Sequence, residues 1–448
     1  MQGLIGLEIH TYLITKEKLF CRCKASRERG LKENTNICPI CTGQPGAKPY
    51  APNAEAVKKA VQIGLMLGCK INNNLKWMRK HYSWPDLPKG YQTTMSGAHA
   101  VPLGENGNFS GIKIGSMHLE EDPASWDPKT GRVDYNRSGL PLVEIVTAPE
   151  FHFAEEVAEW VKKLVHALSY LKIVDSNAGI KIDVNVNIPG KTDRVEIKNI
   201  NSIESVVRAI NYELERQARE GSVLETRRFD ELSGKTVSMR SKEKQEDYRF
   251  IADPDLRDVI LDKKFIGKLE SELPEMPEEK LAKLVKNWKI DKKNAEVLAK
   301  NLDIAEFFER VVEKTDDGSF ALPWVTIELL RVLNWNKTTL DRVAIKAEHF
   351  AKLLELVRSK KITELQAKQV LNKFVPKSFD PSGTESKIDD EKELERIAKD
   401  ILKKSSGVIS GIKERDRKIN YAMGEIMKAT QRRADYKVVR KVLEKLVK

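Results

Sequence analysis

Hydrophobic and polar residues alternate in short runs up to about residue 254, and this alternation predicts β-strands. The clearest run is Ile180–Ile188, where apolar residues take one face and Lys181, Asp183, Asn185 and Asn187 take the other. We therefore expect a sheet with one polar, functional face. The other expected strands are Gly3–Tyr12, Gly111–Met117, Val133–Tyr135, Leu142–Thr147 and Arg194–Ile197.

Helical periodicity interrupts the strands at Ala54–Leu67, Ala154–Leu171 and Ser202–Glu220. The second of these helices has an apolar stripe of the kind that packs on a sheet, which consists of Val157, Trp160, Val161, Leu164, Val165, Leu168 and Leu171. Strands mixed with covering helices predict an α+β fold with a mixed or antiparallel sheet.

After Leu273-Pro-Glu-Met-Pro277 the pattern is wholly helical, with Asp291 and Asp303 as expected helix starts. Turn-forming residues at Phe379–Thr384 mark a linker. We therefore predict three domains, which are an α+β domain at 1–272, a helical domain at 273–378 and a helical tail at 385–448.

The composition is that of a soluble globular protein, with 40% hydrophobic and 32% charged residues in 448. No run approaches the roughly 18 apolar residues that a membrane helix needs. The first ten residues lack the cationic flank and the longer apolar run of a signal peptide. We expect a cytoplasmic protein of two or three domains, with no membrane partner.

The net charge of +12 is concentrated near the end of the sequence. Residues 401–448 hold fourteen Lys and Arg against five Asp and Glu. A local surplus of one sign indicates a polyanionic partner, and we favour RNA. The alternative is a tail that only docks on the helical domain through its apolar stripe. The cations expected to contact the RNA are Lys428, Arg432, Arg433, Lys437 and Arg440.

Four of the five cysteines form two close pairs, Cys21 with Cys23 and Cys38 with Cys41. Fourteen residues separate the pairs, and such spacing is typical of a structural zinc knuckle, here at 21–41. Four unrelated buried thiols are the alternative. A catalytic zinc is disfavoured because a complete set of four cysteines leaves no open position for water.

Acidic residues and an imidazole recur on the predicted strands, at Glu8, His10, Glu120, Asp183 and Glu196. Oxygen ligands with an occasional imidazole suit Mg²⁺, although each carboxylate taken singly is more often a surface group. The segment Arg79–Gln92 interleaves aromatics, cations and prolines, which suits stacking on a base and contact with phosphate. The sequence has no glycine-rich phosphate loop, so any ATP must be held by metal and side chains.

Read in order, these motifs resemble the B subunit family of aspartyl/glutamyl-tRNA amidotransferases along nearly the whole sequence. The motifs that carry the resemblance are Ile5-Gly-Leu-Glu-Ile-His10, Asn36-Ile-Cys-Pro-Ile-Cys41, Pro85-Asp-Leu-Pro-Lys-Gly-Tyr-Gln92, His118-Leu-Glu-Glu-Asp122, Asp134-Tyr-Asn-Arg-Ser-Gly-Leu-Pro-Leu-Val-Glu144, Val195-Glu-Ile-Lys-Asn199, Asp247-Tyr-Arg249 and Met423-Gly-Glu-Ile-Met-Lys-Ala-Thr430.

The resemblance implies a cradle-shaped kinase domain that binds ATP, Mg²⁺ and the aminoacylated end of a misacylated tRNA, followed by a helical domain and a tail that contacts the tRNA. It implies phosphorylation of the side-chain carboxylate of Asp or Glu on tRNA and then amidation by ammonia. The ammonia would come from an amidase A subunit, and a small helical C subunit would complete a heterotrimer.

The resemblance also assigns site residues. Glu8, His10 and Glu121 would be magnesium ligands. Catalytic positions would include these three together with Glu120, Asp183 and Glu196. The nucleotide or the tRNA end would be bound by Lys80, Tyr82, Lys89, Tyr91 and Lys198.

Two other interpretations remain. The E subunit of a glutamyl-tRNA-specific amidotransferase shares the cradle, but it normally carries an inserted domain for which Gln217–Asp255 leaves no room. A non-catalytic tRNA-binding protein would have no use for converging carboxylates, which repel phosphate. The sequence does not decide between Asp-tRNA and Glu-tRNA.

Overall fold

The computed structural model describes residues 2–28, 30–97, 100–175, 179–200, 202–241 and 249–447. The chain divides into two compact units, Met1–Glu275 and Met276–Lys448. The first two residues of the motif Asp247-Tyr-Arg249 lie outside the described residues.

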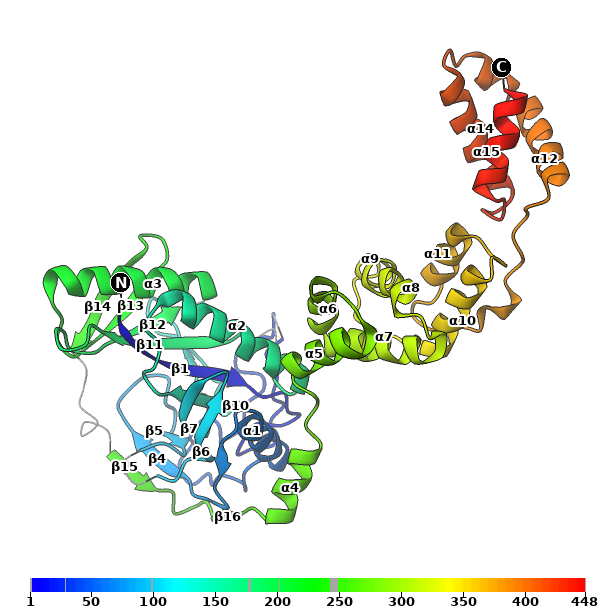
Figure 1. Cartoon of the computed structure of the whole chain (residues 1–448). Helices are drawn as coiled ribbons and strands as arrows, with labels where there is room; N and C mark the ends of the chain where they lie inside the picture. Colours follow the sequence, from blue (N-terminus) through cyan, green and yellow to red (C-terminus); the bar gives the residue numbers. More distant parts are fainter. Residues whose placement is uncertain are drawn as a thin grey trace. The chain divides into compact units, whose positions relative to one another are not determined.

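A large sheet forms the centre of the first unit (Figure 1), and its described strands follow the order β14-β13-β12-β11-β1-β10-β7-β6-β2. All described neighbours are antiparallel except β12 and β13. Their bounds are β1 (Leu4–Tyr12), β2 (Lys70–Ile71), β6 (Gly104–Phe109), β7 (Ile112–Glu121), β10 (Pro141–Thr147), β11 (Lys181–Asn187), β12 (Val195–Ile200), β13 (Glu225–Asp230) and β14 (Lys235–Ser241).

Helices cover the apolar face of this sheet, where Ile5, Leu7 and Ile9 are at most 1% exposed. The helices are α1 (Ala54–Met66), α2 (Ala154–Leu171) and α3 (Ile203–Glu220), and α2 packs against both of the others. The side chains of Asn53 and Ser202 cap α1 and α3 by accepting from backbone N–H groups. The apolar stripe of α2 is confirmed except at Val165, which is exposed because it lies at the edge of the stripe, about 80° from Val157 at 100° per residue.

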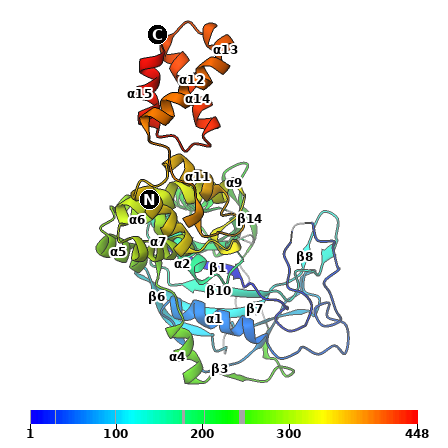
Figure 2. The ribbon, with the colours of Figure 1, turned by 90° about the vertical axis from the view of Figure 1, so that its right-hand side faces the viewer.

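Shorter elements complete the first unit. The strands β15 (Arg249–Ala252), β4 (Met78–His81) and β5 (Tyr91–Thr94) form a small sheet, and β5 also packs against β7. Figure 2 shows β8 (Ser125–Trp126), which pairs with β9 (Val133–Asp134). The remaining elements are β3 (Asn74–Leu75), β16 (Val259–Ile260) and α4 (Lys263–Ser271).

The described part of the second unit is helical and contains two apolar cores. The first core is built from Leu284 to Phe374 and the second from Leu394 to Val447. Around the first lie α5 (Pro277–Trp288), α6 (Lys292–Ala299), α7 (Leu302–Thr315), α8 (Gly318–Pro323), a π-helix (Trp324–Leu329), α9 (Leu330–Trp335), α10 (Ala347–Arg358) and α11 (Glu364–Asn372).

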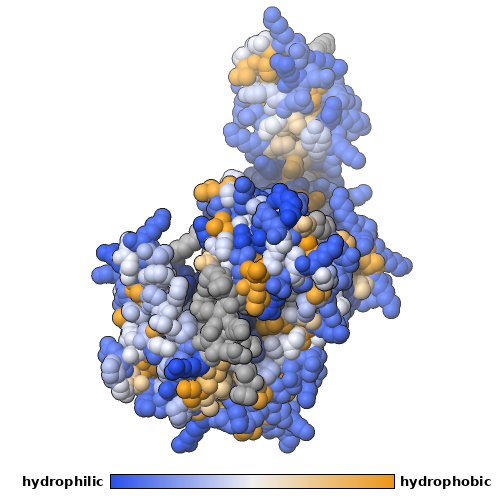
Figure 3. All heavy atoms as spheres, turned by 90° about the vertical axis from the view of Figure 1, so that its left-hand side faces the viewer, coloured by the Kyte–Doolittle hydropathy of each residue, from blue (hydrophilic) through white to orange (hydrophobic). Residues whose placement is uncertain are grey.

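The second core joins α12 (Glu391–Lys404), α14 (Arg415–Ala429) and α15 (Tyr436–Leu446), with the short α13 (Ser406–Ser410) between α12 and α14. The apolar stripe of α15 packs here, since Val439, Val442 and Leu443 are at most 2% exposed. Hydrophilic residues predominate on the face of this bundle seen in Figure 3. The predicted α+β unit followed by helices is thus confirmed.

Both helices begin within one residue of the predicted starts, but only one of the two aspartates is the cap. Asp291 caps α6, and its side chain accepts from the N–H of Asn294. Asp303 does not cap α7, because Asn301 provides the cap and accepts from the N–H of Ile304. Asparagine caps helices as well as aspartate does, and Asp303 instead places its charge in the first turn, where the helix dipole favours it.

Candidate functional site

A row of polar side chains crosses the sheet on the face opposite the covering helices. In the strand register, Glu8 lies opposite Asp183, His10 lies opposite Glu144, and Glu144 lies opposite His118. Directly opposite residues of antiparallel strands have their side chains on the same face and close together. The strands β11, β1, β10 and β7 therefore gather a continuous polar row from segments far apart in the sequence.

Three carboxylates of this row converge at one end. Glu8, Asp183 and Glu196 each place one oxygen within 4.8 Å of the others. The Nζ of Lys198 lies 2.7 Å from Asp183 Oδ2 and 2.8 Å from Glu196 Oε1. The side-chain amide of Asn185 donates to Glu8 Oε1 over 2.9 Å.

The electrostatics of this acidic group favour a cation. Burial raises the pKa of Glu8, and the nearby charges of Glu144 and Glu196 raise it further. Lys198 neutralises one of the three negative charges when all are ionised, and a divalent cation matches the remainder. The donor set of carboxylate oxygens fits Mg²⁺, which prefers oxygen ligands.

A second part of the row surrounds Glu144. His10 Nε2 lies 3.4 Å from Glu144 Oε1, and although burial lowers the pKa of His10, the hydrogen bond and charge of Glu144 raise it overall. Burial and the charge of Glu144 raise the pKa of Glu120 to about 7. Glu120 accepts hydrogen bonds from the hydroxyl of Thr94 and, over 2.9 Å, from the amide of Gln92.

Glu121 is engaged elsewhere. Its Oε1 accepts from the backbone N–H of Thr93 over 2.9 Å and forms an ion pair with the ammonium of Lys89. Within the described ranges, the acidic group close enough to share an ion contains neither His10 nor Glu121. The structure therefore brings Glu8 together with Asp183, Glu196 and Lys198, while the roles of His10 and Glu121 as metal ligands stay predictions.

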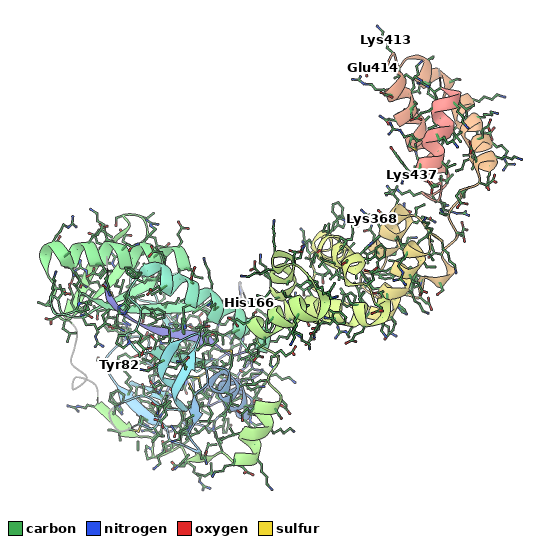
Figure 4. All side chains as sticks on the ribbon, viewed as in Figure 1. Tyr82, His166, Lys368, Lys413, Glu414 and Lys437 are labelled. Atoms are coloured by element: carbon green, nitrogen blue, oxygen red, sulfur yellow. The ribbon has the colours of Figure 1, made fainter. Side chains whose placement is uncertain are left out.

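The predicted binding segment Arg79–Gln92 forms the hairpin of β4 and β5 with the loop between them. Tyr82 follows β4 directly, as labelled in Figure 4, and the Nζ of Lys80 lies 5.8 Å from its ring centre. The guanidinium carbon of Arg79 lies 4.5 Å from the ring centre of Tyr91, and the Nζ of Lys89 lies 4.9 Å from the same ring centre. The cations and aromatics of the segment thus contact one another within the hairpin.

The four predicted cysteines come together. The Sγ atoms of Cys21, Cys23, Cys38 and Cys41 all lie within 4.8 Å of one another, and those of Cys38 and Cys41 are 3.9 Å apart. A tetrahedral zinc with Zn–S bonds of about 2.3 Å separates its sulfur ligands by about 3.8 Å. The thiol set therefore fits a structural zinc ion.

A buried lysine supports this cluster. Lys18 is 1% exposed, and its Nζ donates to Asn36 O over 2.9 Å and to Tyr135 O over 3.2 Å. It also lies 3.6 Å from Cys41 Sγ. A hydrogen bond from Cys21 and the charge of Lys18 lower the pKa of Cys41 to about 5, which favours a thiolate at this position.

The tail cations differ in their surroundings. Arg433 forms an ion pair with Glu385, and Arg440 Nε lies 3.1 Å from Glu444 Oε1. In the part of the chain that the structure describes, Lys428, Arg432 and Lys437 are exposed and have no carboxylate within ion-pair distance. These three cations surround the turn between α14 and α15.

Sequence reasoning did not single out Glu144 or Lys18 as site residues. Glu144 had a usable signal, because it is a charged residue within the apolar run Pro141–Thr147. Lys18 had no such signal, since an isolated lysine is usually exposed.

No described helix combines the length and apolar composition needed to cross a membrane.

Comparison with known proteins identifies relatives along the chain. Residues 3–267 match a family model described as the GatB/GatE catalytic domain, and residues 306–447 match one described as the GatB domain. The B subunit of the aspartyl/glutamyl-tRNA(Asn/Gln) amidotransferase of Methanopyrus kandleri is 40% identical, over 98% of this chain and 97% of its own. The protein of the same name from Methanocaldococcus jannaschii is 39% identical, over 98% of this chain and 96% of its own. The one from Methanothermobacter thermautotrophicus is 38% identical, over 96% of this chain and 97% of its own.

Proposed function

This chain belongs to the family of aspartyl/glutamyl-tRNA amidotransferase B subunits, and from that premise we propose that it activates misacylated tRNA for amidation. In this proposal the chain transfers the γ-phosphoryl group of ATP to the side-chain carboxylate of Asp or Glu esterified to tRNA. A carboxylate is a poor electrophile at neutral pH, so amidation requires such a leaving group.

The reaction has two bond exchanges. An oxygen of the substrate carboxylate attacks the γ-phosphorus, the bond to the bridging oxygen breaks and ADP leaves. Ammonia then attacks the carbonyl carbon of the acyl phosphate, the carbon–oxygen bond breaks and phosphate leaves, with loss of a proton from nitrogen. The first step needs compensation of phosphate charge more than covalent participation of the protein.

The observation that carries the proposal is the acidic group of Glu8, Asp183 and Glu196 on adjacent strands. These residues would hold Mg²⁺, with His10 and Glu121 as further predicted ligands. Bound Mg²⁺ would neutralise charge on the ATP phosphates. Lys198 holds two of the carboxylates in place and keeps the group from repelling phosphate as strongly as three unpaired carboxylates would.

The hairpin of β4 and β5 would receive the nucleotide or the tRNA end. The charge of Lys80 reduces the rise in the pKa of Glu120 and contributes, after His10 and His118, to lowering the pKa of Glu144, so Lys80 lies near the polar row. Tyr82 and Tyr91 are the aromatic residues predicted to contact this ligand. Lys89 and Lys198 would exchange their ion pairs with Glu121 and with the carboxylates of the acidic group for contacts to phosphate. Catalytic roles for His10, Glu120, Asp183 and Glu196 belong to the same proposal.

Ammonia must be supplied by partner subunits in this proposal, namely an amidase and a small helical companion. Cys69, the cysteine outside the cluster, is 6% exposed, and burial raises its pKa to about 11. A buried thiol of high pKa is a poor nucleophile for glutamine hydrolysis. Residues 1–272 would perform activation in the cytoplasm, residues 273–378 would form the helical domain, and the tail at 385–448 would bind the tRNA.

The testing experiment is reconstitution with the amidase and its companion, ATP, Mg²⁺, glutamine and each misacylated tRNA. We expect amide formation on at least one tRNA with ADP released in equal amount. Asp183→Asn and Glu196→Gln should each lower the rate by at least about a hundredfold, by analogy with removal of a charge-stabilising group. Asp230→Asn is the control, since Asp230 is a carboxylate on neighbouring β13 whose partner is Ser233. Full activity in both site variants would overturn the proposal.

A further inference from the structure

The cysteine cluster contacts the loop that carries Lys89 through a glycine. Gly43 lies two residues after Cys41, has a φ of +65°, and donates its N–H to Ile40 O over 3.1 Å. A Cβ atom at Gly43 would lie 2.4 Å from Pro88 O and 2.8 Å from Lys89 N. Both neighbours are backbone atoms, which cannot rotate away as a flexible side chain can, so a methyl group there must displace the loop.

A second residue of the cysteine segment lies near the Lys89 side chain. Its Nζ lies 6.0 Å from the ring centre of Phe20, the residue before Cys21. The same ammonium forms its ion pair with Glu121 and donates to Thr93 Oγ1 over 3.2 Å. The side chain of Lys89 is 13% exposed. Both ends of the cysteine segment therefore border this one lysine.

We propose that Gly43 is a positioning residue for Lys89, so that the folded cysteine segment sets where the Lys89 ammonium lies. Gly43 touches no substrate and acts only through the backbone of Pro88 and Lys89. The inference rests on the proposed function for its catalytic consequence, since Lys89 is there a ligand of the nucleotide or the tRNA end. It gives the cysteine segment a role in the reaction beyond stabilising the fold.

The chain offers a matched control in Gly46. Gly46 lies in the same segment and has a φ of +84°, but a Cβ atom there would meet nothing within 4 Å. Alanine at either position strains a left-handed backbone to a similar degree. Only alanine at Gly43 also pushes on Pro88 and Lys89, so the difference between the two variants isolates the contact.

The first measurement is the reactivity of Lys89 toward limiting acetic anhydride, with acetylation read by peptide mass spectrometry on the full chain. We expect a several-fold increase in Gly43→Ala and wild-type reactivity in Gly46→Ala. Phe20→Leu removes the second contact, keeps an apolar residue in the core, and should also increase the reactivity. Unchanged Lys89 reactivity in Gly43→Ala would overturn the positioning role of Gly43, whatever the activity and whatever the reactivity in Phe20→Leu.

The second measurement is amidation by the reconstituted complex. Gly43→Ala should lower kcat about tenfold or more with little change in KM for tRNA, because small displacements of a positioned group are costly. Gly43→Ala combined with Lys89→Met should be no slower than Lys89→Met alone, since both changes act on one group. Increased Lys89 reactivity with unaltered kcat would overturn the place of Lys89 in the proposed function and leave the contact itself intact.

Discussion

Glu120 carries its carboxylate inside the polar row, where it is 5% exposed and faces the charge of Glu144. Its hydrogen bonds from Thr94 and Gln92 do not offset the cost of burial, so its pKa rises to about 7. At neutral pH this residue therefore exists in both protonation states, which suits a group placed next to proton-transferring chemistry.

This raised pKa predicts a pH-dependent effect of Glu120→Gln on stability. Between about 4.5 and about 7 the folded protein binds a proton that the unfolded chain has released, so the contribution of Glu120 to stability falls as pH rises. Glutamine does not titrate. From pH 4.5 to pH 8 the variant should therefore gain stability relative to wild type, by up to about 3 kcal/mol.

Urea unfolding of both proteins at pH 5 and pH 8 measures this gain. Glu159→Gln, at an exposed position of α2, is the control and should differ from wild type equally at both pH values. If Glu120→Gln also differs from wild type equally at pH 5 and pH 8, the raised pKa is wrong.

At the scale of elements, the cysteine segment has little regular secondary structure to hold it. Its described contacts are mostly backbone turns and single side-chain hydrogen bonds, such as those of Lys18, the two that Asn136 Oδ1 accepts from the N–H groups of Thr35 and Asn36, and the bond from Ser138 Oγ to Cys41 O at 2.8 Å. A segment of this kind gains much of its folding free energy from the metal that it binds. Loss of one thiolate should therefore affect metal content and stability together.

Cys38→Ser should reduce zinc from one ion per chain to a small fraction. It should also lower the melting temperature of the first unit by about 5 °C or more, as expected for a loss of about 2 kcal/mol. Metal analysis and thermal unfolding provide the measurements. Cys69→Ser is the control, because Cys69 is a cysteine of the same unit that lies outside the cluster, and this variant should retain zinc. Wild-type protein without zinc, whose melting is unaffected by a chelator, would contradict the prediction.

At the scale of the whole molecule, the tail cations form two groups, those that pair with a carboxylate of the bundle and those that are exposed. Lys441 and Lys445 pair with Glu391 within the bundle at 3.4 and 2.8 Å, whereas Lys428 and Lys437 are among the exposed cations at the turn between α14 and α15. Substitutions test these cations better than removal of α14 and α15 would, because α12 shares its core with these two helices and their removal would expose that core.

Lys428→Gln with Lys437→Gln should weaken tRNA binding and reduce the slope of log K against log salt by about 1.4 to 1.8, if each lysine contacts one phosphate. The control, Lys441→Gln with Lys445→Gln, removes the same charge and should leave the slope nearly unchanged. Titration with tRNA at several salt concentrations measures both slopes. Equal slopes in the two double variants would mean that the turn is only a solvated surface.

The sequence by itself determined the elements whose signals are local. The alternation in β11 and the apolar stripe of α2 fixed which faces are buried, because side-chain periods of 2 and 3.6 follow from backbone geometry alone. The spacing of the cysteines likewise predicted that the two pairs come together in one cluster, since close pairs of thiols are typical of a shared metal site. The strand β13 was missed, because its Glu225 and Arg227 break the apolar alternation. They are accommodated by tertiary contacts, which include an ion pair with each other and contacts of Arg227 with Glu213 on α3 and with Thr236 on β14.

Tertiary structure alone decided how the acidic residues are grouped. Glu8 is 175 residues from Asp183 along the chain, and only the pairing of β1 with β11 in one register sets them opposite each other. The strand register also placed His10 opposite Glu144. The packing of β5 on β7 brought Glu121 into an ion pair with Lys89. A shift of one residue would turn each of these side chains to the other face, and it is burial of the apolar face under the helices that excludes such a shift.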